Sequence, residues 1–170
     1  MDKFSVMIAK KIQSKYSVPV KHINVAVGGW SSVNGLENFE SKVLSTPADL
    51  MVLGFGMNDG RTELDLFHDN VEKMVKSFRE NNPNGEVVLL STTYPNTESD
   101  WVRNQPLTVN ELYKIQEKYG YTGVADMTKM HENLLATGKR YRDMTGNNVN
   151  HPNDFLARIY AQVILKTLIG

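Results

Sequence analysis

The chain has no cysteine among its 170 residues, and this absence removes several kinds of chemistry. A disulfide framework, a thiolate nucleophile and a zinc site built on cysteine are all excluded. An excess of charge of one sign is also lacking, because 19 Lys and Arg balance 19 Asp and Glu. Nucleic-acid-binding proteins normally carry a basic patch, whereas the basic residues here are scattered. We therefore expect no nucleic-acid partner.

Long apolar runs are lacking as well. No run reaches the roughly 18 residues that a membrane-spanning helix needs, and the most apolar stretch, residues 155–169, is interrupted by Arg158 and Lys166. We therefore expect no membrane partner. We expect no signal peptide within these residues, and the sequence leaves the compartment open. Hydrophobic residues at 41% and charged residues at 22% are typical of globular proteins, and no repeat or linker divides the chain, so we expect one domain over residues 1–170.

Two hydrophobic periods alternate along the sequence. Helical spacing of apolar residues predicts helices over about 4–16, 36–44, 67–78, 108–120, 128–136 and 153–168. Short apolar runs predict strands at 23–27, 48–55, 86–93 and 121–127. Thr108 with Glu111 three residues later is a capping-box pattern, which predicts the start of a helix. Alternating strands and helices are typical of parallel βαβ units, so we expect an α/β fold, a three-layer α/β/α sandwich.

In such sheets ligands bind beyond the carboxyl ends of the strands. Chemistry is therefore expected in the loops at residues 28–32, 56–59 and 94–106. Asn58 follows a buried strand directly, where its amide could donate to a developing oxyanion, and Gly29 leaves a backbone N–H accessible for the same purpose. The alternative for Asn58 and Asp59 is to cap a helix, and their spacing alone does not decide between these roles.

His151 precedes Pro152, which can start a helix, so this imidazole is expected at a loop-to-helix junction on the same edge of the sheet. A histidine there could act as a general base near neutral pH. The commoner role of a lone histidine is an exposed surface position, which we expect for His22, His68 and His131. No group of His, Asp and Glu has the spacing of metal ligands, so we expect no metal and no cofactor.

Three segments of the sequence resemble the second, third and fifth blocks of the SGNH (GDSL-type) esterase and acylhydrolase superfamily. They are residues 24–29 (Asn-Val-Ala-Val-Gly-Gly), 48–59, which end in Gly-Met-Asn-Asp, and 148–153 (Asn-Val-Asn-His-Pro-Asn). The resemblance implies a flavodoxin-like parallel sheet and a serine hydrolase that cleaves carboxylic esters, often acetyl groups on sugars. It also implies that Gly29 and Asn58 form the oxyanion hole and that His151 is the general base.

The family's nucleophile lies in a Gly-Asp-Ser motif at the end of its first strand, and this sequence lacks that motif. Met1-Asp2-Lys3 is no substitute, because lysine cannot replace an activated hydroxyl. We therefore expect a family member cut just after its first block, with the first central strand missing and the serine upstream. The 170 residues alone should then be inactive or very weakly active. We expect them to associate with the missing N-terminal segment or with a second copy.

Asn148 is the second departure, since it stands where the family usually has Asp, three residues before the histidine. An Asn carbonyl can orient the imidazole but cannot stabilise the imidazolium by charge. Asp143 or Asp154 could supply that charge, and nothing in the sequence chooses between them.

Residues beside these motifs complete the expected site. Ser31 and Ser32 are alternative nucleophiles, although a serine after a glycine turn is usually a helix cap. Trp30 and Trp101 lie in loops beyond the carboxyl ends of the strands, where they would stack on a sugar ring or pack in the core. With Trp30 and Trp101, Ser31 and Asp59 form the expected substrate-binding set.

A function of another class is left open by the sequence. The absent serine and Asn148 both favour a non-catalytic carbohydrate- or ligand-binding module on the same scaffold. A flavin-binding protein of the flavodoxin type is a third alternative, although no loop is rich in Gly, Ser and Thr at the start of a helix. The residues upstream would discriminate between the first two, because Gly-Asp-Ser there indicates an enzyme.

Overall fold

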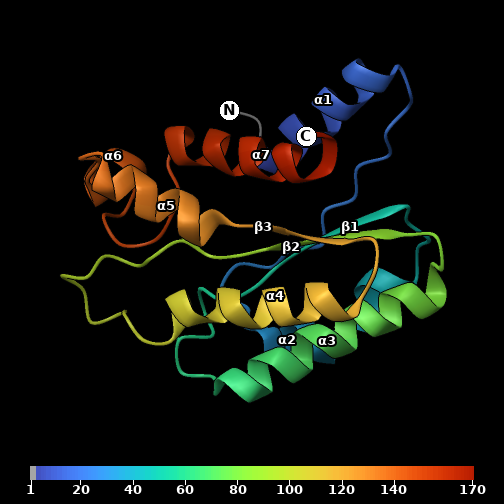
Figure 1. Ribbon diagram of the computed structural model, residues 1–170, viewed down its shortest axis with the longest axis horizontal. Helices are drawn as coiled ribbons and strands as arrows, with labels where there is room; N and C mark the ends of the chain where they lie inside the picture. Colours follow the sequence, from blue (N-terminus) through green and yellow to red (C-terminus); the bar gives the residue numbers. More distant parts are fainter. Residues whose placement is uncertain (1–2) are drawn as a thin grey trace.

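A three-stranded parallel sheet lies between two layers of helices in the computed structural model, which describes residues 3–170 (Figure 1). The strands β1 (Leu50–Gly54), β2 (Glu86–Leu90) and β3 (Thr122–Ala125) are neighbours in this order. The register pairs Val52 with Val88 and Val88 with Gly123. All three carboxyl ends therefore meet at one edge, and the predicted α/β fold is confirmed. The expectation about Met1 and Asp2 concerns residues outside the described part.

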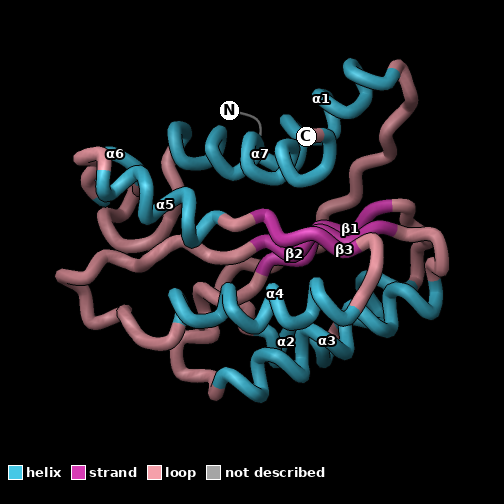
Figure 2. The backbone as a smooth tube through the Cα atoms, viewed as in Figure 1, coloured by secondary structure: helices cyan, strands magenta, loops and turns pink. Residues whose placement is uncertain are grey.

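The helices divide between the two faces of the sheet (Figure 2). One layer holds α1 (Phe4–Tyr16), α5 (Met127–Ala136), the short α6 (Tyr141–Met144) and α7 (Asp154–Ile169). The other holds α2 (Ser32–Glu37), α3 (Leu64–Asn81) and α4 (Thr108–Lys118). A π-helical turn, η1 (Glu40–Leu44), follows α2, and a 3₁₀ turn, η2 (Gln105–Leu107), precedes α4. No helix within residues 3–170 is long and apolar enough to span a membrane.

The alternation of side chains along β2 explains why the sheet is covered on both faces. Val87 and Leu89 join a buried cluster with α3 and α4, whereas Val88 and Leu90 join a second cluster with α1 and α7. Successive strand residues point to opposite faces, so a continuous apolar run belongs between two helix layers. Burial of each such side chain stabilises the fold by about 1.5–3 kcal/mol.

The segment at residues 21–27 differs from the prediction of a strand. It runs from α1 toward β1 as an extended chain that pairs with no strand of the described residues (Figure 1). Its alternate apolar residues Ile23, Val25 and Val27 are 50%, 41% and 42% exposed. A strand needs a hydrogen-bonded neighbour. Residues 3–170 provide no neighbouring strand that pairs with this segment, so the prediction of a strand here is wrong.

The strand β1 has a free edge on the side away from β2. Within residues 3–170 this strand pairs with β2 alone. Val52, in the middle of β1, is 39% exposed and belongs to neither buried cluster. The sheet therefore ends at an unpaired edge that carries an exposed apolar side chain.

The predicted capping box at the start of α4 is also wrong. Thr108 is already the first helical residue, and its hydroxyl donates to the Gln105 carbonyl oxygen at 2.7 Å. The Glu111 carboxylate turns away to Lys114 at 2.8 Å and to His68 at 3.2 Å. His68 from α3 and Lys114 from the next turn of α4 therefore bind the Glu111 carboxylate, which the capping-box pattern assigned to a backbone N–H.

Candidate active site

The turn at residues 28–31, named here the glycine turn, holds a backbone N–H in an open position. Gly29 has a φ of +82°, which glycine adopts without strain. A Cβ at this position would meet no atom within 4 Å. No residue within 3–170 accepts a hydrogen bond from the Gly29 N–H, so a ligand oxygen can approach it directly.

The asparagine turn, at residues 56–59, follows β1 and faces the glycine turn. Asn58 is exposed, and its Nδ2 donates to the Trp30 carbonyl oxygen at 3.1 Å. An amide nitrogen carries two hydrogens, so one hydrogen is left for another acceptor. The structure therefore brings the two predicted oxyanion donors, Gly29 and Asn58, to neighbouring turns.

Asp59 lies beneath these turns rather than beside them. Its side chain is 0% exposed. Oδ1 accepts hydrogen bonds from the Ser32 N–H at 2.8 Å and the Ser32 hydroxyl at 2.6 Å, and Oδ2 accepts one from the Gly56 N–H at 2.9 Å. The prediction that Asp59 binds substrate does not fit this position, because three protein donors enclose the carboxylate.

The two serines after the glycine turn hold local structure. Ser31 is the N-cap residue of α2 and forms a capping box with Asn34. Ser32 is completely buried, and its oxygen also accepts a hydrogen bond from Asn70 Nδ2 at 3.2 Å. Neither hydroxyl is hydrogen-bonded to a histidine within the described residues. These contacts fit a role for the two serines at the start of a helix rather than a role as nucleophile.

The histidine loop, at residues 145–152, leads into α7 and is closed by a backbone bridge between Thr145 and Pro152. The Asn147 side-chain oxygen accepts hydrogen bonds from three backbone N–H groups, of Val149 at 3.0 Å, Asn150 at 3.0 Å and His151 at 2.9 Å. Asn147 was not among the predicted site residues, although an asparagine that binds the backbone two residues later is a common turn signal.

His151 is exposed at the end of this loop. No side chain within residues 3–170 forms a hydrogen bond or ion pair with its imidazole. Asn148 has a left-handed backbone, with a φ of 54°, and its carbonyl accepts a hydrogen bond from Asn96. Asn148 therefore lies three residues before His151 in the chain, and the described residues show no contact between the two side chains.

The loop at residues 94–106, named here the bridging loop, joins the asparagine turn to the histidine loop. Asn96, only 5% exposed, donates from Nδ2 to the Asn148 carbonyl at 2.8 Å, and its N–H donates to the Val149 carbonyl at 3.0 Å. Gln105, 2% exposed, donates to the carbonyls of Trp101 at 2.8 Å and Met57 at 3.4 Å. Neither residue could be predicted from the sequence, because buried amides in a polar loop carry no periodic signal.

The segments that resemble the second and third SGNH blocks thus meet through the hydrogen bond from Asn58 to Trp30. The bridging loop contacts both the third of these blocks, at Met57, and the fifth, at Asn148. A family model described as the GDSL-like lipase/acylhydrolase family matches residues 2–159. The chain belongs to this family. The family and the fold are those of carboxylic ester hydrolases.

Solved structures of esterases share the fold of this GDSL-family chain. An acetylxylan esterase from Geobacillus stearothermophilus matches with a TM-score of 0.85 and 14% identity, over 99% of this chain and 82% of that one. An α/β hydrolase enzyme from the metagenome of Lake Arreo, Spain, matches at 0.83 and 12%, over 97% and 80%. A two-domain esterase active on acetylated mannans matches at 0.77 and 21%, over 97% and 43%. No curated protein sequence matches significantly.

Two tryptophans lie in or beside these loops. Trp101, on the bridging loop, is 45% exposed, so one part of its indole can contact a ligand. Trp30, in the glycine turn, is half-buried, and the Lys42 ammonium lies 5.6 Å from its ring centroid. No cluster of His, Asp and Glu within residues 3–170 is arranged to hold a metal ion.

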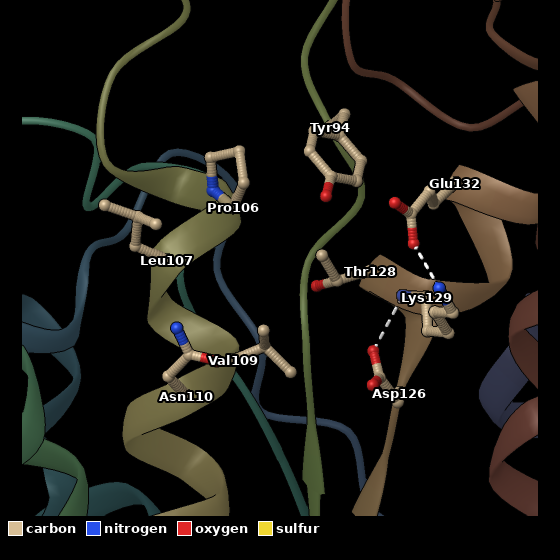
Figure 3. Close-up of a pocket in the computed structure, with 9 residues that line it drawn as sticks. All are labelled: Tyr94, Pro106, Leu107, Val109, Asn110, Asp126, Thr128, Lys129 and Glu132. Carbon is tan, nitrogen blue, oxygen red and sulfur yellow. Dashed lines mark hydrogen bonds and ion pairs between the residues drawn. The ribbon is translucent and has the colours of Figure 1, made fainter.

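A separate cavity of about 280 Å³ lies between the first turns of α4 and α5 (Figure 3). Its apolar wall includes Pro106 and Leu107, and the Lys129–Glu132 ion pair, at 2.7 Å, lies opposite. Burial and the nearby Glu132 raise the pKa of Tyr94, whose ring forms part of the lining. None of the predicted site residues lines this cavity.

Behind Tyr94 lies His131, which is 0% exposed, so the expectation of a surface position is wrong for this histidine. The Tyr94 N–H donates to His131 Nδ1 at 3.2 Å. Burial lowers the pKa of His131 to about 4. The ring is therefore neutral at physiological pH, and it supports the start of the bridging loop.

Proposed function

We propose that the chain is the larger part of a serine ester hydrolase that removes acetyl or other short acyl groups from carbohydrate or small esters. The observation that carries this proposal is the pair of donors on adjacent turns, the open Gly29 N–H and the Asn58 amide. Donors held in place before the reaction stabilise a developing oxyanion, and loss of one lowers the rate by about 10²–10³. Membership of the GDSL-like family supports the reaction class.

The residues take the following roles in this reaction. A serine hydroxyl attacks the acyl carbonyl while its proton passes to His151, and the carbonyl oxygen accepts hydrogen bonds from Gly29 and Asn58. The intermediate collapses as His151 returns the proton to the leaving alcohol. Water then attacks the acyl-serine by the same route. His151 lacks a carboxylate partner within residues 3–170, and in serine proteases the change of that carboxylate to an amide lowers kcat about 10⁴-fold.

The carbohydrate part of the proposal is supported by Trp101 and Trp30. A half-exposed indole offers the flat apolar face on which sugar rings stack, and Trp101 is 45% exposed on the bridging loop. The esterases of similar fold include one named for acetylxylan and one described as active on acetylated mannans. We therefore assign the alcohol part of the substrate to a saccharide.

We further propose that the nucleophile is carried by a strand outside these 170 residues, which docks against the free edge of β1. Such a strand would pair with β1 and cover Val52, which is 39% exposed. On its other side it would meet the exposed apolar residues of the segment at residues 21–27. A parallel strand in this place would end beside the glycine and asparagine turns, where the serine is needed. Its source is the upstream part of the same protein.

The experiment compares hydrolysis of p-nitrophenyl acetate by the 170-residue chain and by a chain extended with its natural upstream residues. We expect turnover from the extended chain and none above buffer from the 170 residues. Asn58→Ala in the extended chain should lower kcat about 10²–10³-fold. The matched control is Asn133→Ala, which changes an exposed asparagine on α5. Turnover by the 170 residues that disappears in Ser31→Ala would overturn the assignment of the nucleophile.

A non-catalytic saccharide-binding module is the second candidate function. The His151 ring without a carboxylate partner favours it. If the extended chain shows no turnover but binds acetylated xylo-oligosaccharides in calorimetry, and Trp101→Ala abolishes that binding, the binding module is the correct function. Turnover by the extended chain eliminates this candidate.

A further inference from the structure

A buried cluster of polar side chains joins the glycine turn to the asparagine turn from below. At its centre is the Asp59 carboxylate, which is 0% exposed. A buried carboxylate destabilises a protein strongly unless donors replace its hydration. Here no Lys, Arg or His forms an ion pair with Asp59 within the described residues. The N–H and hydroxyl of Ser32 and the N–H of Gly56 take that place, at 2.8, 2.6 and 2.9 Å.

The two oxygens of Asp59 bind two different segments. Oδ1 binds Ser32, the first residue of α2, which follows the glycine turn. Oδ2 binds Gly56, at the start of the asparagine turn. Asn70, from α3, donates to the Ser32 oxygen at 3.2 Å and so leaves the Ser32 hydroxyl hydrogen to point at Asp59. Hydrogen bonds to a carboxylate are about twice as strong as neutral ones.

We propose that Asp59 is a positioning residue that sets the spacing between the Gly29 N–H and the Asn58 amide; this inference rests on the proposed function. Gly29 lies three residues before Ser32, and Asn58 directly precedes Asp59. Apart from the Asp59 hydrogen bonds, the two turns are joined by the bond from Asn58 to the Trp30 carbonyl, which lies at the exposed surface. A displacement of about 1 Å in a catalytic group lowers a rate about 10²-fold.

Two substitutions separate positioning from general stability. Asp59→Asn puts an NH₂ group where the carboxylate accepts from a donor, so at least one of the three donors loses its acceptor. Ser32→Ala is milder, because it removes the hydroxyl and keeps the Ser32 N–H. Asp49→Asn is the matched control, since Asp49 is an exposed aspartate directly before β1.

The test uses amide hydrogen exchange and a ¹H–¹⁵N NMR titration of the 170-residue chain with sodium acetate, whose carboxylate probes the donor pair. In the parent chain and in Asp49→Asn we expect saturable shifts of the Gly29 N–H and of the Asn58 side-chain amide. In Ser32→Ala and Asp59→Asn the Kd of acetate should rise at least tenfold, and exchange of the Gly56 N–H should be at least tenfold faster. In the extended chain, Ser32→Ala should lower kcat and leave KM unchanged.

The outcomes separate the inference from the proposed function. If Ser32→Ala keeps the parent Kd for acetate and the parent exchange rate at Gly56, the positioning role is overturned even where the chain is a working esterase. If the parent chain shows no acetate shifts at Gly29 and Asn58, the proposed oxyanion site is overturned, and the role of Asp59 at it falls as well. If Asp59→Asn does not fold, Ser32→Ala and its kcat decide the question.

Discussion

His131 shows how the interior changes the chemistry of a single residue. Its ring stacks on Tyr94, with centroids 6.2 Å apart, and meets the edge of Tyr141 at 5.5 Å. Because Nδ1 accepts a hydrogen bond from the Tyr94 N–H, the ring carries its proton on Nε2. Burial lowers its pKa from 6.5 to about 4, since charge is disfavoured away from water.

The lowered pKa of His131 predicts a loss of stability on the acid side. Between pH 6.5 and pH 4 the unfolded chain binds a proton at this histidine and the folded chain does not, so its contribution is complete above pH 6.5 and falls as the pH is lowered. From pH 7.5 to 5.0 this loss is about 2 kcal/mol. Urea unfolding at the two pH values should show a drop smaller by that amount in His131→Asn, whose amide oxygen can still accept from Tyr94.

The matched control is His22→Asn, because His22 is exposed. This variant should show the same drop in the free energy of unfolding as the parent chain. An equal drop in the parent and in His131→Asn would contradict the burial argument.

At the scale of the element, α2 is a short helix whose position depends on close packing. It has 6 residues, too few to be stable alone. Gly35, in its middle, is buried against the ring of Phe55, and a Cβ there would lie 2.2 Å from the nearest ring atom. The glycine therefore lets α2 approach the residue that follows β1, and this approach brings Ser32 to Asp59.

Gly35→Ala is accordingly expected to destabilise the protein. Alanine favours a helix over glycine by up to about 1 kcal/mol, whereas overpacking of a core destabilises by about 1–3 kcal/mol. With three ring atoms within 2.8 Å of the new Cβ, overpacking outweighs propensity, and we expect a net loss of about 1–2 kcal/mol. Urea unfolding measures it. Gly120→Ala, where nothing lies within 4 Å, should change stability little, and a stabilised Gly35→Ala would contradict the packing argument.

At the scale of the whole molecule, the unpaired edge of β1 is the feature with the largest consequence. Unpaired strand edges are templates for pairing with another chain. Two exposed apolar side chains add a hydrophobic driving force for this association. They are Val52 in β1 and Val25 in the segment at residues 21–27. The balanced charges of the chain give little repulsion between copies.

The 170-residue chain is therefore expected to self-associate, with a mass in light scattering above its own 19.2 kDa. Val52→Lys should shift this mass toward the monomer, because a lysine on an edge strand opposes edge pairing. The control is Leu66→Lys, which changes a 47% exposed leucine on α3 and should leave the association unchanged. The extended chain should be monomeric if its own strand covers the edge. A monomeric 170-residue chain with native sheet content would count against this prediction.

Much of the fold could be predicted because its elements have strong local patterns. The stripe of Phe67, Val71, Met74 and Phe78 on α3 repeats with the helical period, and the run of valines and leucines in β2 suits a strand buried on both faces. The segment at residues 21–27 has an equally good strand pattern, yet pairing depends on a neighbour that local pattern does not contain.

The sequence by itself determined the α/β class and the residues that match the three family blocks. It also excluded the chemistry that cysteine would have supplied. Only the tertiary structure decided that Asp59 lies beneath the site and that Asn96 and Gln105 join its loops. It also decided that His131 is buried and that β1 has a free edge. These features depend on hydrogen bonds and contacts between residues far apart in the chain, and hydrophobic period and turn chemistry report only on residues close together.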